Sequence, residues 1–154
     1  MTQTLAIRSA QDSDLEAVLA LYRHLIPDDP PVLPDQARAA FNRLLLYPGS
    51  AILLGYADTT LLTTCTLVVI PNLTHAATSY ALIENVVTHA DHRGQGHGKA
   101  ILKAATDQAW AQGCYKVMLS TSSRNPNTLA FYAAAGFEQS RTGFQIRRPP
   151  ARLP

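Results

Sequence analysis

The feature of this chain that most constrains its fold is a strand that runs into a glycine-spaced turn and then into a helix. Residues 80–88 are apolar and rich in β-branched side chains, glycine stands at 94, 96 and 98, and residues 98–112 have helical periodicity. Backbone N–H groups at a helix start lack acceptors within the helix, and glycines let an anion approach them closely. The pattern therefore predicts a strand–turn–helix unit with a phosphate-binding turn.

Two common phosphate-binding motifs do not fit this turn. In a Walker A alignment, Arg93 takes the place of the first glycine and Ala100 that of the hydroxyl residue. In the dinucleotide-binding pattern, Lys99 stands where the last glycine belongs. Neither a P-loop nor a dinucleotide-binding turn is therefore predicted.

Two other segments together resemble a known superfamily. Arg93, Gly96 and Gly98 match the signature Arg/Gln-x-x-Gly-x-Gly/Ala, and the downstream run from Asn125 to Phe-Tyr-Ala-Ala-Ala-Gly-Phe at 131–137 matches a second one. Both are typical of the GNAT superfamily of N-acetyltransferases, which this chain resembles over most of its length. The resemblance implies acetyl transfer from acetyl-CoA to an amine.

Periodicity and turn residues predict the order β-α-α-β-β-β-α-β-α-β. The expected strands cover 5–8, 51–57, 61–70, 80–88, 115–121 and 137–147, and the expected helices cover 12–26, 35–47, 98–112 and 127–135. The first helix is expected to be capped by Asp12 or Ser13, and its apolar stripe reaches Leu25 and Ile26. The resemblance implies an α/β GNAT fold. Its mixed, mostly antiparallel sheet would have six to seven strands, splayed between the fourth and fifth, and about four helices.

Length and composition predict one domain in a reducing compartment. The chain has 154 residues, 47% of them hydrophobic, with a net charge of +2, so neither a nucleic acid nor a membrane surface is an expected partner. We expect a single domain over 1–148, a loose tail over 149–154 and a cytoplasmic location, because no secretion signal is visible. Cys65 and Cys114 stand in apolar surroundings and are expected to be buried, reduced thiols.

The resemblance also assigns the coenzyme contacts. The pyrophosphate is expected on the glycine turn, formed by Arg93, Gly94, Gln95, Gly96, His97, Gly98 and Lys99. Val86, Val87 and Thr88 would lie along the pantetheine arm, on a strand that carries a bulge, and the N–H of Val86 would polarise the thioester carbonyl. Asn125 and Tyr132 are further expected coenzyme contacts. The alternative for the turn is an ordinary glycine-rich helix start, and for the strand an ordinary place in the core.

Three side chains have a functional and a structural interpretation each. Tyr132 is the expected general acid for the leaving thiolate, or else an aromatic packed beside Phe131. Glu84 interrupts an apolar strand and is the expected general base or ammonium anchor, or else part of a salt bridge at the sheet edge. Asn125 contacts the coenzyme or caps a turn before Pro126. The catalytic candidates are thus Tyr132 and Glu84.

The histidines carry weaker signals, and no metal site is expected. His89, His92 and His97 flank the turn and are interpreted as exposed loop residues, with the backbone N–H of His97 available to a phosphate. His24 has no partner visible in the sequence, and His75 could face the acceptor site. Neither cysteine has the spaced partners that a zinc site needs.

The preferred function is N-acetylation of a small primary amine, such as an amino sugar, an amino acid, a polyamine or a drug-like amine. Parts of the chain resemble glucosamine-6-phosphate N-acetyltransferases, but Asn85 replaces an acidic residue of that family, and Ser120-Thr121 stands where it has another. The alternatives are a protein or peptide N-acetyltransferase and a non-catalytic acyl-CoA sensor. The resemblance leaves open a homodimer that forms through residues 143–147.

Overall fold

A computed structural model describes residues 4–148, so the expected tail over 149–154 lies outside the described residues. The chain divides into two compact units, with the boundary between Leu119 and Ser120. The second unit contains helix α5 (Pro126–Ala134). The first unit contains β1 (Ala6–Ser9), α1 (Leu15–Tyr22), α2 (Pro34–Leu46), β2 (Ala51–Ala57), β3 (Thr60–Ile70), α3 (Thr74–Ala77), β4 (Tyr80–Thr88), α4 (His97–Ala111) and β5 (Val117–Met118).

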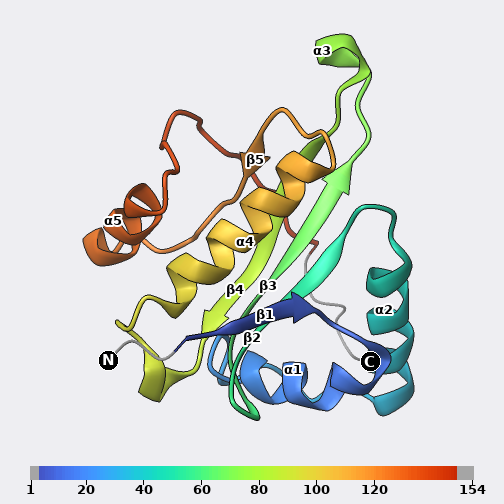
Figure 1. The fold of residues 1–154 in the computed structure, drawn as a ribbon, viewed down its shortest axis with the longest axis vertical. Coiled ribbons are helices and arrows are strands. Elements are labelled where there is room, and N and C mark those ends of the chain that lie inside the picture. The colour runs from blue at the N-terminus through green and yellow to red at the C-terminus, as the bar shows by residue number, and fades with distance from the viewer. Residues whose placement is uncertain (1–3, 149–154) are drawn as a thin grey trace. The chain divides into compact units, whose positions relative to one another are not determined.

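The strands of the first unit form one mixed sheet in the order β1-β2-β3-β4-β5 (Figure 1). Each neighbouring pair from β1 to β4 is antiparallel, and β5 runs parallel to β4. Strands β2 and β3 join through a tight turn at Asp58, whose φ is 51°. The predicted hairpin is therefore confirmed to within one residue, and the predicted strand over 80–88 matches β4.

Helices cover both faces of this sheet (Figure 1). On one face, Ile52 and Leu54 pack with Val18 of α1 and Phe41 of α2. On the other face, the sulfur of buried Cys65 lies 4.0 Å from a backbone oxygen of α4. Strands buried on both faces have nearly continuous apolar sequences, which explains why β2 and β3 show little alternation.

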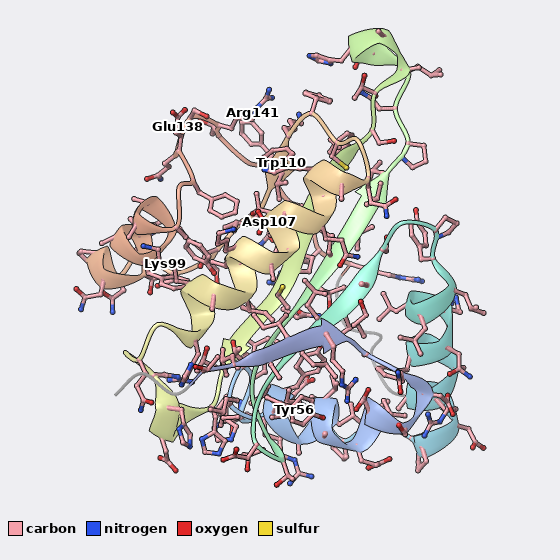
Figure 2. The ribbon with its side chains drawn as sticks, in the orientation of Figure 1. Tyr56, Lys99, Asp107, Trp110, Glu138 and Arg141 are labelled. Atoms are coloured by element: carbon pink, nitrogen blue, oxygen red, sulfur yellow. The ribbon has the colours of Figure 1, made fainter. Side chains whose placement is uncertain are left out.

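The first helix starts later than expected, and Asp14 rather than Asp12 or Ser13 organises the start. Arg8 of β1 donates two hydrogen bonds to the Asp14 carboxylate, at 2.7 and 2.8 Å, and the backbone N–H of Gln11 donates a third at 2.7 Å. The Tyr56 hydroxyl lies 3.3 Å from the same carboxylate, on the α1 side of the sheet (Figure 2). These donors, Arg8 above all, lower the pKa of Asp14 from 3.8 to about 2. Asp14 therefore ties α1 to β1 and β2.

Prolines set the limits of the first two helices. Helix α1 ends at Tyr22, so Leu25 and Ile26 are not part of its buried stripe and are 37% and 51% exposed. The residue before a proline is driven out of the helical region, and Ile26 precedes Pro27. Helix α2 begins at Pro34, because a proline in the first turn lacks only an N–H that has no acceptor there.

The last expected strand is not formed, and this corrects the predicted strand count. Within residues 4–148, no strand follows β5, and β5 itself spans two residues rather than 115–121. Phe144 and Ile146 alternate with polar residues, as in a strand, but are 96% and 98% exposed. Alternation favours an extended chain, yet a strand forms only beside a partner edge. The described sheet therefore has five strands, not six to seven, and the described chain has five α-helices, one of them the short α3, rather than about four.

No helix among the described residues is both long and apolar enough to cross a bilayer.

Candidate active site

The glycine turn has the geometry of an anion cradle. A short 3-10 turn over Ala90–His92 follows β4, and Gly94 and Gly96 then adopt positive φ values of 73° and 84°. Gly96 is the N-cap of α4, and a Cβ built on either glycine would meet no atom within 4 Å. Left-handed backbone is costly for residues other than glycine, so the glycines are needed for conformation and leave open space beside the turn.

The amides of this turn are available to a ligand. The first hydrogen bond of α4 runs from the N–H of Ala100 to the carbonyl of Gly96. The N–H groups from Gly94 to Lys99 have no acceptor among the described residues. The positive end of the helix dipole adds to these donors, so the turn is suited to a phosphate or pyrophosphate. A pyrophosphate therefore fits the residues that the sequence assigned to it.

The strand before the turn carries the expected bulge. Thr64 of β3 pairs with Val87, but Thr66 pairs with Glu84, so β4 has one residue more than β3 between these pairs. Asn85 takes up the extra residue with a φ of 51°, a conformation that asparagine tolerates better than most residues. Asn85 and Val86 consequently have no register partner on β3. A bulge of this kind re-aims backbone groups at a site.

The next strand accompanies only the beginning of β4. Strand β5 pairs with Ala81 and Leu82, and no further pair is formed along that edge in the described residues. The part of β4 from Ile83 to Thr88 therefore leaves this edge without a strand partner. An unpaired edge can hydrogen-bond an extended ligand as an added strand would. This is the place that the sequence assigned to the pantetheine arm, along Val86, Val87 and Thr88.

Glu84 lies at the bulge, and its side chain has no partner among residues 4–148. Its side chain is exposed, although β4 is an inner strand of the sheet with β3 on one side and β5 on the other. No hydrogen bond or ion pair joins it to another residue within 4–148. The salt bridge that was the structural alternative for Glu84 is therefore not formed in the described chain.

Tyr22 and Thr66 lie on the α1 side of the bulge. Burial raises the pKa of the Tyr22 phenol, while the side chains of Thr66 and Asn85 beside it act in the opposite direction. The Thr66 hydroxyl is buried and has no well-formed hydrogen bond in the described chain, so its contact with Tyr22 is a loose one. The bulge is thus backed by polar groups rather than by apolar core.

The guanidinium of Arg93 is held by two backbone carbonyls of the protein, so it is not free to bind a phosphate with all of its N–H groups. Its Nε donates to the carbonyl of Thr88 at 3.2 Å, and its Nη2 donates to the carbonyl of His24 at 2.9 Å. His24 in turn accepts a hydrogen bond from the N–H of Ala90 at 3.3 Å. The sequence predicted no partner for His24. These two hydrogen bonds join residues 66 and 69 positions apart, so no local pattern could have indicated them.

His97 is not the exposed loop residue that the sequence suggested. Its side chain is 3% exposed, and its buried Nε2 has no hydrogen-bond partner in the described residues. The buried ring leaves the backbone N–H of His97 as the group expected to meet a phosphate, and this role stays a prediction. His89 and His92 lie beside it, with the His92 ring centroid 6.5 Å from that of His97.

The second unit holds the other two candidates. The Asn125 side chain accepts a hydrogen bond from the N–H of Asn127 at 2.9 Å and caps α5, so the structural interpretation of this residue is realised. Tyr132 of α5 packs against Phe131 and Phe137, with centroid distances of 5.0 and 6.4 Å. Burial raises the pKa of the Tyr132 phenol, so this group keeps its proton at neutral pH.

Neither cysteine is built as a nucleophile. Both thiols are free and buried. Burial raises the pKa of Cys65 to about 12 and also raises that of Cys114, so both remain protonated near neutral pH. In the described part of the chain, no three His, Cys, Asp or Glu side chains are grouped as metal ligands would be.

Comparison with known proteins decides the family. The family model described as the acetyltransferase (GNAT) family matches residues 18–137, which include the glycine turn, the bulged strand and α5. This chain belongs to the GNAT acetyltransferase family. Its α/β fold with a mixed sheet is a GNAT fold, and acetyl-CoA-dependent transfer of an acetyl group to an amine is the activity of this family.

Relatives of this GNAT protein act on different amines. A glucosamine 6-phosphate N-acetyltransferase from Trypanosoma brucei brucei is 29% identical over 142 residues, which cover 86% of this chain and 88% of the relative. The L-amino acid N-acyltransferase MnaT from Escherichia coli is 24% identical over 147 residues, with coverage of 86% and 79%. A solved structure from Agrobacterium tumefaciens, of a protein assigned as an acetyltransferase, is 43% identical with a TM-score of 0.88. The match covers 93% of this chain and 99% of the Agrobacterium chain.

Proposed function

We propose that this GNAT protein transfers an acetyl group directly from acetyl-CoA to the primary amine of a small molecule. The acceptor would be an amino sugar, an amino acid, a polyamine or a drug-like amine. The observation that carries the proposal is the cradle of free amides from Gly94 to Lys99, which directly follows a bulged strand with an unpaired edge. The two features are suited to the pyrophosphate and the pantetheine arm of one ligand.

In this proposal the chain binds the coenzyme mainly through its backbone. The glycine turn, with Gln95 and Lys99 exposed beside it, holds the pyrophosphate. The unpaired edge of β4 from Val86 to Thr88 pairs with the pantetheine amides. Asn125 keeps its amide nitrogen for the coenzyme while its oxygen caps α5.

In this proposal the N–H of Val86, the Glu84 carboxylate and the Tyr132 phenol act on the reacting atoms. The bound coenzyme supplies an activated acetyl group as a thioester. The N–H of Val86, next to the bulge, donates to the carbonyl oxygen on which negative charge develops. Glu84 accepts a proton from the acceptor ammonium, or holds that ammonium until water removes the proton, so that the free amine can form the new C–N bond.

Tyr132 completes the transfer as the general acid. As the C–S bond breaks, the sulfur leaves with the bonding electron pair and needs a proton. The Tyr132 phenol is protonated at neutral pH because burial raises its pKa, and a phenol is a suitable acid for a thiolate. The acceptor nitrogen loses two protons in all: the ammonium gives one to Glu84 or to water before the attack, and the nitrogen loses the second as the C–N bond forms. The sulfur gains one proton from Tyr132, whose phenolate regains one of the two released by the nitrogen, so that one proton goes to solvent overall.

The acceptor class rests on the chemistry of Glu84 and on the relatives. A carboxylate without a protein partner is suited to an ammonium group, which sugar-phosphate and amino-acid acceptors share. Asn85 stands where glucosamine-6-phosphate N-acetyltransferases have an acidic residue, and Ser120-Thr121 replaces another. These differences favour a small amine of another kind over the sugar phosphate.

A homodimer is the assembly that we propose. Phe144 and Ile146 alternate with polar residues in an extended segment and are almost fully exposed. A second copy of this segment is a suitable partner, because it would pair the backbone and cover both side chains. Sedimentation of the wild type against a Phe144→Ser, Ile146→Ser variant tests this, and a monomeric wild type would contradict it.

Calorimetric titration with acetyl-CoA, coenzyme A and ATP tests the proposed function. We expect saturable binding of both coenzyme forms and no comparable binding of ATP. A panel of sugar, amino-acid, polyamine and peptide amines, read by release of the free thiol, then identifies the acceptor. Failure of both coenzyme forms to bind would overturn the proposal, and turnover of peptides alone would replace the small amine by a protein substrate.

A further inference from the structure

We propose that His24, just beyond the end of α1, is a positioning residue for the coenzyme-binding turn. It holds the segment His89–Arg93 in the conformation from which the glycine turn starts. The inference rests on the proposed function, since it takes the turn beginning at Gly94 as the pyrophosphate site. His24 would not touch the coenzyme itself.

Two backbone-linked hydrogen bonds join His24 to this segment from opposite ends. The His24 Nδ1 accepts from the N–H of Ala90 at 3.3 Å, and the His24 carbonyl accepts from Arg93 Nη2 at 2.9 Å. Arg93 Nε also donates to the carbonyl of Thr88, at 3.2 Å. The segment between β4 and the glycines is therefore fixed at its start and at its end, and both contacts converge on His24, just beyond α1.

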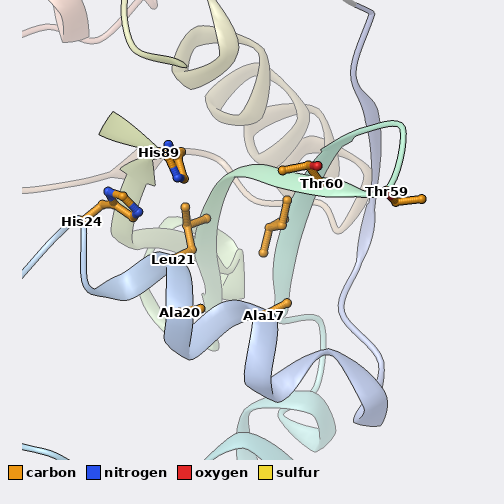
Figure 3. A pocket seen from close by; sticks show the side chains of 8 residues that line it. Ala17, Ala20, Leu21, His24, Thr59, Thr60 and His89 are labelled. Carbon is orange, nitrogen blue, oxygen red and sulfur yellow. The ribbon is translucent and has the colours of Figure 1, made fainter. Parts of the chain in front are cut away.

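Ring packing adds a third contact. The His24 and His89 ring centroids are 4.1 Å apart, with 42° between the planes, and the two side chains lie next to each other (Figure 3). His89 Nδ1 accepts from the N–H of Asp91 at 3.2 Å. The Nδ1 atoms of the two rings thus accept hydrogen bonds from two amides of the same short segment.

The His24 ring lies at an open pocket and near several charged groups. Its ring borders a cavity of about 340 Å³, lined by Ala17, Ala20, Leu21, Thr59, Thr60, Leu61 and His89 (Figure 3). The charged or titratable groups nearby are Arg93, His89, His92 with its ring 5.4 Å from that of His89, Asp91 with its carboxylate 4.0 Å from His89 Nδ1, and Asp58 at the neighbouring turn.

The contact matters for binding because the cradle works only if its amides already point outward. If the segment before the turn moves freely, part of the binding free energy is used to order it. The loss of one hydrogen bond between neutral groups should reduce coenzyme affinity about three- to tenfold.

A pair of substitutions at His24 separates positioning from general destabilisation. In His24→Asn the side-chain oxygen stands near the former Nδ1 and still accepts from Ala90, but it cannot be protonated. In His24→Ala the acceptor is lost. Calorimetry with coenzyme A at pH 7.5 should show binding about three- to tenfold weaker for His24→Ala and within about twofold of wild type for His24→Asn.

Rescue by His24→Asn is the readout that a purely structural role would not give, because this variant restores only the acceptor for the Ala90 N–H. Equal losses of coenzyme affinity in His24→Ala and His24→Asn would overturn the proposal. If His24→Ala fails to fold, an affinity of His24→Asn well below that of wild type would overturn it.

Hydrogen exchange in the free protein separates this inference from the proposed function. The Ala90 amide and its neighbours over 89–98 should exchange faster in His24→Ala than in wild type. Arg23→Ala is the matched control, since Arg23 is exposed and its side chain has no partner within residues 4–148. Unchanged exchange in His24→Ala would refute the contact, whereas a wild type that binds no coenzyme would refute the proposed function alone.

Discussion

Replacement of Gly96 by alanine tests directly whether the turn is shaped for a ligand. Gly96 has a φ of 84° and starts α4, and a Cβ there would meet no atom within 4 Å. The cost of Gly96→Ala is therefore backbone strain without a clash. For a residue with a Cβ, the left-handed conformation costs about 1–2 kcal/mol.

The free protein can respond to this strain in two ways. If the turn keeps its shape, the free energy of unfolding falls by the strain energy and coenzyme affinity is unchanged. If the turn relaxes, stability is retained, but the coenzyme must restore the strained conformation and binds more weakly. In both cases the loss of stability plus the loss of binding free energy should total about 1–2 kcal/mol.

Gly113→Ala is the matched control for this experiment. Gly113 follows α4 with a φ of 77° and, like Gly96, has open space where a Cβ would stand. The effect of alanine on the unfolded chain is the same at both positions. In urea unfolding, Gly113→Ala should lower the free energy of unfolding. In calorimetry, its dissociation constant for coenzyme A should equal that of wild type.

Two results would refute the reasoning about the turn. One is a summed loss near zero for Gly96→Ala, which would mean that the bound turn does not need the left-handed residue. The other is an equal loss of coenzyme affinity in Gly113→Ala, which would mean that strain anywhere around α4, and not the cradle geometry, controls binding.

Three further substitutions test the acid, the base and the anchor of α1. Tyr132→Phe should lower turnover at least about tenfold with coenzyme affinity unchanged, as measured by thiol release and calorimetry, and unaltered turnover would exclude this acid. Glu84→Gln should lower kcat/KM about a hundredfold and flatten the acidic side of the pH–rate profile, whereas a profile of unchanged shape would make Glu84 structural. Asp14→Asn should cost roughly 1–2 kcal/mol of unfolding free energy at pH 7, from the lowering of the Asp14 pKa from 3.8 to about 2, discounted because Arg8 is 45% exposed. Since the folded-state pKa is the lower one, this difference is complete above about pH 5, is largely lost by about pH 2 and vanishes below it; equal differences at pH 7 and pH 2 in urea titrations would contradict the ion pair.

Local sequence rules predicted the parts of the fold that depend on neighbouring residues. Strand β4 is bounded by polar turns and has the predicted limits, and α4 differs by one residue because Gly96, rather than a side chain, caps it. The glycines at 94 and 96 were predicted to allow positive φ, and both have it. These features are set by steric limits that a residue carries with it wherever the chain goes.

The predictions that failed depend on partners far away in the sequence. Residues 137–147 have the alternation of a strand, but no described segment pairs with them, and alternation cannot specify a partner. His24 looked isolated because its three contacts lie between Thr88 and Arg93, and no local pattern marks them. Leu25 and Ile26 continued a helical stripe that Pro27 ends.

The difference between the two kinds of residue bears on how the site works. A glycine turn fixes which backbone conformations are accessible, but several remain open to it, since glycine is permissive in both halves of the Ramachandran map. Selection among them must come from groups outside the glycines, and His24, just beyond the end of α1, supplies such groups through its contacts with Ala90 and Arg93. A chain with the same glycine signature but without an acceptor at position 24 should therefore bind the coenzyme more weakly, although its motif is intact. Motif identity and coenzyme affinity can then vary independently among related chains.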